Sequence, residues 1–248
     1  MTQSALIIGL GLIGGSAGMA LRRHGWRVSY LDPHVPLDDA QRAGAADARA
    51  EGIVEADLIV LATPVDAAVA HLRTVETTAV ITSTCSVMRA LRDVARGTFV
   101  AGHPMAGSQE RGLPAATAEL FEGKPWFVDA ENETVDAFVR DCGGVLERVD
   151  ANEHDAAVAL TSHLPQVLST ALAAYLDQQP DVLRFAGTGL RSFLRLAGSD
   201  ASVWTSVIDA NRDHLAPHAE AIAELARAIV DGSAPDAFQR AQNFWRKL

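Results

Sequence analysis

The feature that most constrains the fold is a short apolar run that ends in a glycine-rich turn near the N-terminus. Residues 5–8 are continuously apolar, a G-x-G-x-x-G pattern occupies residues 9–14, and a helix-forming run follows over residues 17–23. A glycine turn of this spacing between a strand and a helix is typical of dinucleotide-binding α/β domains. The sequence therefore predicts a Rossmann-type domain that begins with this strand, turn and helix.

Each residue of the turn has an expected part in cofactor binding. Gly9 permits the sharp bend out of the strand, Gly11 lets a pyrophosphate approach the backbone, and Gly14 lets the helix pack closely against the strand. Leu12 and Ile13 open the helix, whose first N–H groups have no partner in the helix and face the phosphates. We expect these five residues to bind the cofactor.

An acidic residue at the expected distance strengthens this prediction. Residues 27–31 read as the second strand, and Asp32 follows them directly. A carboxylate at this place accepts hydrogen bonds from the ribose hydroxyls and repels a 2′-phosphate, so NAD is favoured over NADP. Pro33 and His34 come next, and neither provides a guanidinium for such a phosphate. The alternative is an ordinary glycine turn with Asp32 as a solvated loop acid.

Composition limits the classes of partner. The 248-residue chain carries a formal charge of −10, and its only lysines are Lys124 and Lys247, so we expect no nucleic-acid partner. The sequence lacks an apolar stretch of the ~20 residues that cross a bilayer, so we expect no membrane partner. Cys85 and Cys142 form neither a disulfide framework nor a zinc pattern, so we expect no metal and a cytoplasmic location.

Strand and helix patterns alternate through the first half of the chain, which predicts a doubly wound α/β domain over residues 1–150. The carboxyl ends of parallel strands meet at one edge, where such domains bind ligands. Further strands are expected at residues 57–62, 78–82, 98–101, 126–128 and 145–149, and helices at residues 37–43, 66–72, 87–95 and 134–141.

The second half changes character and predicts an all-helical domain over residues 151–248. Apolar residues recur at helical spacing over residues 164–176 and again over residues 215–229, Gly232 ends the second helix, and Pro235 begins a last one. Helical domains with several apolar stripes often bury them against a second copy, so we expect a homodimer.

Candidate catalytic and cofactor-binding residues follow the ends of predicted strands. Thr63 and Pro64 follow residues 57–62 and are expected at the cofactor site. His103 follows residues 98–101, where a neutral imidazole can accept a proton from a substrate hydroxyl. With an ordinary pKa of about 6.5, such a base predicts a rate that rises with pH. Ser86 can donate to His103 or to substrate, or cap the helix that follows. His103 can equally be a loop histidine bonded to backbone.

Further polar residues lie in the helical half. Pro165 should kink its helix and free polar groups near His163 and Gln166, which share a face three residues apart. A structurally satisfied histidine is the equal alternative.

Two arginines are candidates for anion binding. If Arg191 and Arg195 lie on one helix, they share a face four residues apart, which suits a bound carboxylate. A solvated helix face is the plainer interpretation.

These segments together resemble the prephenate/arogenate dehydrogenase family. The motifs that carry the resemblance are residues 9–16, Asp32, residues 62–64, Ser86-Val87, residues 102–108, residues 162–165, Arg191 with Arg195, Ser199-Asp200 and Trp204. The resemblance implies an NAD-binding Rossmann domain, a helical dimerisation domain, and oxidative decarboxylation in tyrosine biosynthesis. It implies that His103 and Ser86 are catalytic, and that Arg195, Gln166, His163, Gly189 and Trp204 bind substrate.

Four positions depart from the family pattern: Ser83, Met88, Gln109 and Gln166. The family commonly has a second histidine at the place of Gln166, near the substrate side chain. A neutral amide there leads us to expect that arogenate is accepted at least as well as prephenate. Two alternatives stay open: a β-hydroxyacid-type dehydrogenase, which needs a catalytic lysine in the helical domain, and a dinucleotide-binding protein without catalysis.

Overall fold

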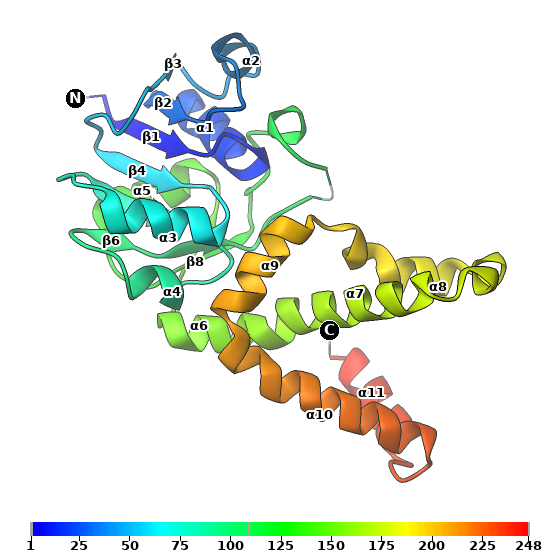
Figure 1. The fold of residues 1–248 in the computed structure, drawn as a ribbon. Coiled ribbons are helices and arrows are strands. Elements are labelled where there is room, and N and C mark those ends of the chain that lie inside the picture. The colour runs from blue at the N-terminus through cyan, green and yellow to red at the C-terminus, as the bar shows by residue number, and fades with distance from the viewer. Residues whose placement is uncertain (1, 109, 248) are drawn as a thin grey trace.

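The first half of the chain forms a six-stranded parallel sheet in the computed structural model, which describes residues 2–108 and 110–247 (Figure 1). The strand order is β3-β2-β1-β4-β5-β6, so the direction of winding reverses between β1 and β4. This reversal is the switch point at which α/β sheets bind ligands. The strands are β1 Ser4–Ile8, β2 Arg27–Leu31, β3 Ala48–Arg49, β4 Leu58–Leu61, β5 Val80–Ser83 and β6 Phe99–Val100.

Both faces of this sheet are covered, which explains the continuous apolar runs in its central strands. Alternate residues of β1 point to opposite faces: Ile7 packs in the cluster that includes α1, and Leu6 packs in the cluster that includes α3. The helices of this half are α1 Leu12–Arg23, α2 Leu37–Arg42, α3 Val65–Thr74, α4 Arg89–Arg92 and α5 Glu133–Asp141. The predicted α/β class is confirmed.

A second sheet was not predicted. It contains β7 Gly102–Pro104, β8 Pro125–Val128 and β9 Val145–Arg148; β7 pairs antiparallel and β9 parallel with β8. His103 was expected directly after a strand, with a loop histidine as the alternative, but it lies within β7 and pairs with Phe127. Gly102 brings this strand close to the larger sheet, since a Cβ at Gly102 would stand 2.7 Å from the carbonyl oxygen of Ser83.

The second half is helical throughout the residues that the structure describes. In Figure 1, α7 and α10 diverge from the region of α6, and α11 folds back beside α10. Pro165 lies just after a π-helical segment, Ala159–His163, which joins α6 to α7 and replaces the simple kink that we predicted. The helices are α6 Ala151–Val158, α7 Leu164–Asp177, α8 Thr188–Phe193, α9 Ala201–Ala210, α10 Arg212–Val230 and α11 Ala237–Trp245.

Two helical regions near the site differ from the helices considered in the sequence analysis. The helix expected over residues 87–95 is a single turn, α4, which ends at Arg92. Arg191 and Arg195 do not share a regular helix, because α8 ends at Phe193 and a 3-10 segment, Leu194–Gly198, follows. Among the described residues, no helix is both long enough and apolar enough to cross a membrane.

Candidate active site

The glycine turn and the predicted ribose-binding acid meet at the carboxyl edge of the sheet. In the parallel register Ile8 lies beside Leu31, so the residues after β1 and β2 emerge together. The Asp32 carboxylate accepts hydrogen bonds from the backbone N–H of Leu10 and of His34, each at 2.8 Å. These two bonds hold the carboxylate against the glycine turn, where a ribose hydroxyl can reach it.

The glycines differ in what surrounds them. Gly9 has a φ of +90°, a conformation that favours glycine, and a Cβ there would stand 2.7 Å from the Ala62 carbonyl oxygen. A Cβ on Gly14 would stand 2.0 Å from the Gly9 carbonyl oxygen. A Cβ on Gly11 would meet nothing within 4 Å. Space is therefore open at Gly11, the residue expected to approach a pyrophosphate.

The surrounding groups fit an anionic dinucleotide. Leu12 and Ile13 form the start of α1, whose first turn has no acidic side chain and no side-chain cap. Its N–H groups are therefore available to phosphate oxygens. Pro64 is the N-cap residue of α3, and the buried hydroxyl of the neighbouring Thr63 has no hydrogen-bond partner in the protein.

A line of buried polar side chains connects the two halves of the chain beside the second sheet. His103 Nδ1 lies 2.9 Å from His154 Nε2, and His154 Nδ1 lies 2.8 Å from Asp155 Oδ1. The exposed fractions are 9%, 2% and 0% respectively, so bulk water cannot replace these contacts. Burial, together with the neighbouring His154 and His163, lowers the pKa of His103 to about 3. His103 is therefore a neutral imidazole near pH 7.

Asp155, and not Ser86, caps the short helix α4. Its two carboxylate oxygens accept the backbone N–H groups of Met88 and Arg89, each at 2.9 Å. The interpretation of Ser86 as the N-cap is therefore wrong, because Met88 holds the N-cap position. The half-buried Ser86 lies beside His163 through its backbone, which partly opposes the lowering of the His163 pKa.

His163 belongs to the same buried cluster. Its Nδ1 lies 3.1 Å from Asn211 Nδ2, its Nε2 is buried without a protein partner, and its ring meets that of Trp204 edge to face at a centroid distance of 5.9 Å. Burial is the main cause that lowers the pKa of His163 to about 4, so this imidazole is also neutral near pH 7. A neutral ring with one free nitrogen can serve a bound ligand.

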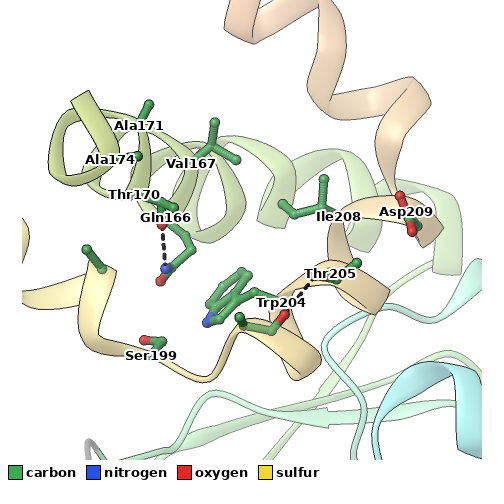
Figure 2. Close-up of a pocket in the computed structure, with 12 residues that line it drawn as sticks. Gln166, Val167, Thr170, Ala171, Ala174, Ser199, Trp204, Thr205, Ile208 and Asp209 are labelled. Carbon is green, nitrogen blue, oxygen red and sulfur yellow. Dashed lines mark hydrogen bonds between the residues drawn. The ribbon is translucent and has the colours of Figure 1, made fainter. Parts of the chain in front are cut away.

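Beside this cluster is a pocket of about 460 Å³ between α7 and α9 (Figure 2). Gln166 and Trp204 extend into the same space from these two helices. The Gln166 Nε2 group donates to Thr170 Oγ1 at 3.1 Å and to the Leu196 carbonyl at 2.9 Å, while Oε1 is buried without a partner. The opposite orientation of the amide would place Oε1 against the Leu196 carbonyl oxygen, two acceptors facing each other, so the donor Nε2 belongs on that side and Oε1 remains the unpaired acceptor.

The remaining predicted substrate residues do not line this pocket within one chain. Gly189 in α8 and Arg195 in the 3-10 segment are both exposed, and neither lines the pocket. Arg191 is exposed as well. The structure therefore brings together His103, Ser86, His163, Trp204 and Gln166, but not Arg195 or Gly189.

Sequence reasoning missed His154, Asp155 and Asn211. Asn211 Nδ2 donates to the Asp155 carbonyl at 2.7 Å and thereby ties α10 to α6. One signal was present: His154 and Val158 are four residues apart, so a polar residue shares the apolar face of this helix.

The departures from the family pattern occupy different surroundings. Ser83 is buried, and its hydroxyl accepts the N–H of Gly102 at 3.2 Å. Met88 is buried in the core and Gln166 lines the pocket. Gln109 lies outside the described residues. Within the described residues, no group of three or more His, Cys, Asp or Glu side chains could hold a metal ion.

Two family profiles match the chain. The profile of the nucleotide-binding domain of prephenate dehydrogenase matches residues 17–153, and that of the prephenate dehydrogenase dimerization domain matches residues 150–241. Together they cover both halves.

Individual relatives agree with these profiles. The chain is 32% identical over 230 residues to a prephenate dehydrogenase of Lactococcus lactis, covering 84% of this chain and 65% of the relative. It is 30% identical over 239 residues to a cyclohexadienyl dehydrogenase of Zymomonas mobilis, covering 85% and 82%. A crystal structure of prephenate dehydrogenase from A. aeolicus, in complex with hydroxyphenyl propionate and NAD+, superposes with a TM-score of 0.84 at 25% identity, over 100% of this chain and 97% of the other. The chain spans just under two thirds of the length of the Lactococcus relative.

Proposed function

Because the chain belongs to the prephenate dehydrogenase family, we propose that it catalyses the NAD-dependent oxidative decarboxylation of prephenate, arogenate or both in tyrosine biosynthesis. The observation that carries this proposal is His103, a buried neutral imidazole beside the carboxyl end of β5. At this edge of the sheet a base can face the nicotinamide end of a dinucleotide held at the glycine turn.

The reaction removes a hydride from ring C4 of the substrate, and NAD supplies the acceptor for it when bound. His103 accepts the hydrogen bond, and then the proton, of the C4 hydroxyl as this group becomes a carbonyl. The ring carboxylate departs as carbon dioxide, and the electron pair of the broken bond makes the ring aromatic and leaves the negative charge on the C4 oxygen. That oxygen takes the proton back from His103, which returns to its neutral form. Ser86 orients the hydroxyl and His103, while burial of the site keeps bulk water away from both.

The chain holds NAD through the glycine turn and Asp32. Gly9, Gly11 and Gly14 form the turn, and Leu12 and Ile13 direct the first N–H groups of α1 toward the phosphates. Asp32 receives the ribose hydroxyls and disfavours the 2′-phosphate of NADP. Thr63 and Pro64 line the same edge, and the buried Thr63 hydroxyl, which has no protein partner, is free to meet the cofactor.

Gln166 supports acceptance of arogenate at least as readily as prephenate. Both N–H bonds of its amide are used within the protein, so the one group that this side chain has left for a ligand is an acceptor, the buried and unpaired Oε1. An ammonium group, present in arogenate and absent from prephenate, can donate to that oxygen. Trp204 lines this pocket, and the ring of His163 packs edge to face against it. Arg195 and Gly189 remain proposed substrate contacts, for which the single chain provides no shared pocket.

We infer a homodimer formed through the helical half, whose profile is that of a dimerization domain. Large apolar side chains on its helices are more than half exposed in the single chain, as expected of surfaces that a second copy covers. They are Tyr175, Leu183, Phe185, Phe193, Phe238, Phe244 and Trp245. The absence of nucleic-acid and membrane partners and a cytoplasmic location stay predictions from composition.

Both alternatives have distinct tests. A β-hydroxyacid-type dehydrogenase needs a lysine in its helical domain, and the only lysine there is Lys247 near the end of the chain. A protein without catalysis would bind NAD and produce no NADH from either substrate.

The decisive experiment measures NADH formation with prephenate and arogenate supplied separately. We expect turnover with at least one of them, and a loss of about 10²–10⁴-fold in kcat for His103→Asn, the range for removal of an acid–base group. NAD binding without turnover of either substrate would refute the proposal, and a strong preference for prephenate would refute the inference from Gln166.

A further inference from the structure

The side chains of His103, His154 and Asp155 form one hydrogen-bonded line, in which each contact has a defined donor and a defined acceptor. The first belongs to β7 and the other two to α6. The two contacts measure 2.9 Å and 2.8 Å, and all three groups are buried. With bulk water excluded, each donor in this line must be matched by an acceptor within it.

The carboxylate sets the direction. Asp155 accepts two backbone N–H groups from the start of α4 in addition to its contact with His154, so it serves as the acceptor at this end of the line. Nδ1 of His154 therefore donates to this carboxylate, and with its single ring proton there Nε2 carries a lone pair. His103 faces this lone pair with its own Nδ1, which must then carry the proton.

We propose that His154 and Asp155 are positioning residues that hold His103 in the Nδ1-protonated tautomer, leaving its Nε2 as the acceptor for the substrate hydroxyl. The hydrogen bond at one ring nitrogen decides which nitrogen of a neutral histidine is protonated. Without a partner at Nδ1 the imidazole populates the Nε2–H form, which donates where the reaction needs an acceptor. This inference rests on the proposed function for its catalytic consequence, whereas the tautomer is a property of the protein alone.

The tautomer can be measured directly. In protein labelled with ¹⁵N-histidine, two-bond ¹H–¹⁵N correlation near pH 7.5 distinguishes a protonated ring nitrogen from an unprotonated one, and the His103 signals are those missing from His103→Asn. We expect protonated Nδ1 and unprotonated Nε2 in the unmodified protein. Protonated Nε2 would overturn the proposal without recourse to any variant.

Three variants test the line itself. His154→Phe removes the acceptor, and we expect the Nε2–H form of His103 to become populated, with kcat lower by about 10–100-fold, the range for loss of a partner that orients a ligand. His154→Gln offers an amide oxygen to His103 and should restore the tautomer and much of kcat. His24→Phe is the matched control, since His24 also lies beside a carboxylate, that of Asp141 at 3.8 Å, on the exposed surface.

The results separate this proposal from the proposed function. His154→Phe with unchanged His103 tautomer and unchanged kcat would overturn the positioning role. A rise in KM alone, with kcat retained, would also overturn it, because a positioning residue for the base acts on turnover. If neither substrate yields NADH while His103 stays protonated at Nδ1, the proposed function fails and the tautomer assignment stands.

Discussion

Two separate alanine replacements in the glycine turn should have different effects: Gly11→Ala should weaken cofactor binding, and Gly14→Ala should destabilise the fold. Gly11 is the N-cap residue of α1 with an extended backbone, φ −80° and ψ −152°, and a Cβ there would meet no atom within 4 Å. A Cβ on Gly14 would stand 2.0 Å from the Gly9 carbonyl oxygen and 3.0 Å from Ile7 Cγ2. The first contact is with backbone, so β1 and α1 must move apart to accept it.

The expected magnitudes follow from these distances. Overpacking costs about 1–3 kcal/mol, and a backbone clash belongs at the upper end, so Gly14→Ala should lose about 3 kcal/mol of unfolding free energy. For a chain of this size that loss lowers Tm by roughly 6–12 °C. Gly11→Ala should change the unfolding free energy by less than about 0.5 kcal/mol. Its methyl group should nevertheless raise the Kd for NAD at least about tenfold, which is about 1.4 kcal/mol.

The assay combines thermal unfolding by circular dichroism, without ligand, with calorimetric titration of NAD into each folded variant. Gly11→Ala should show a near-normal Tm and weak binding, and Gly14→Ala a lowered Tm. Unchanged NAD affinity in Gly11→Ala would place the pyrophosphate elsewhere. An unchanged Tm in Gly14→Ala would refute the argument from close packing.

Three further predictions concern the site. Burial lowers the pKa of His103 to about 3 from an ordinary value near 6.5, so the neutral imidazole persists as the pH falls. Where His103 alone controls kcat/KM, this quantity should therefore stay level from about pH 5 to 8. A rise in His103-dependent turnover centred near pH 6.5 would contradict this prediction. Asp32→Ser should weaken NAD binding and admit NADP, and an unmodified protein that prefers NADP in steady-state kinetics would contradict our interpretation of Asp32. Arg195→Ala should raise KM at least about tenfold, because it removes a charge-assisted hydrogen bond of roughly 1.5–3 kcal/mol. Arg191→Ala should raise KM less, and Arg195→Lys should restore only part of the affinity for substrate. Unchanged kinetics in Arg195→Ala would refute the carboxylate contact.

Local patterns in the sequence sufficed to place the glycine turn and Asp32 beside each other at one edge of the sheet. The glycine turn and Asp32 can be recognised from spacing alone, because the strand, turn and helix are consecutive in the chain and the sheet register then places their ends together. The second sheet was missed because β7 has three residues, too few for an alternating pattern. The pH dependence expected for His103 rests on an ordinary pKa, and the structure changes this prediction because burial, which no local pattern reveals, lowers that pKa.

The histidine line lay beyond reach of local reasoning for a related reason. His103 and His154 are 51 residues apart in the chain, and Asp155 caps a helix 67 residues before it. A cap usually comes from the residue next to the helix, which is why Ser86 was the natural but wrong choice. Arg191 and Arg195 were placed on one face by assuming regular helix, which the 3-10 segment Leu194–Gly198 interrupts.

The π-helical segment Ala159–His163 sets how far the side chains of α7 are rotated about the helix axis relative to those of α6. Each residue of an α-helix turns the chain by about 100°, so the wider turn of a π segment shifts everything after it relative to everything before it. His154 and Asp155 lie before the segment and Gln166 lies after it. Deletion of one residue within this segment would therefore leave His154 and Asp155 in place yet rotate Gln166 away from the pocket. The chain should tolerate substitution of the exposed Leu160 and Thr161 far better than a change in the length of the segment.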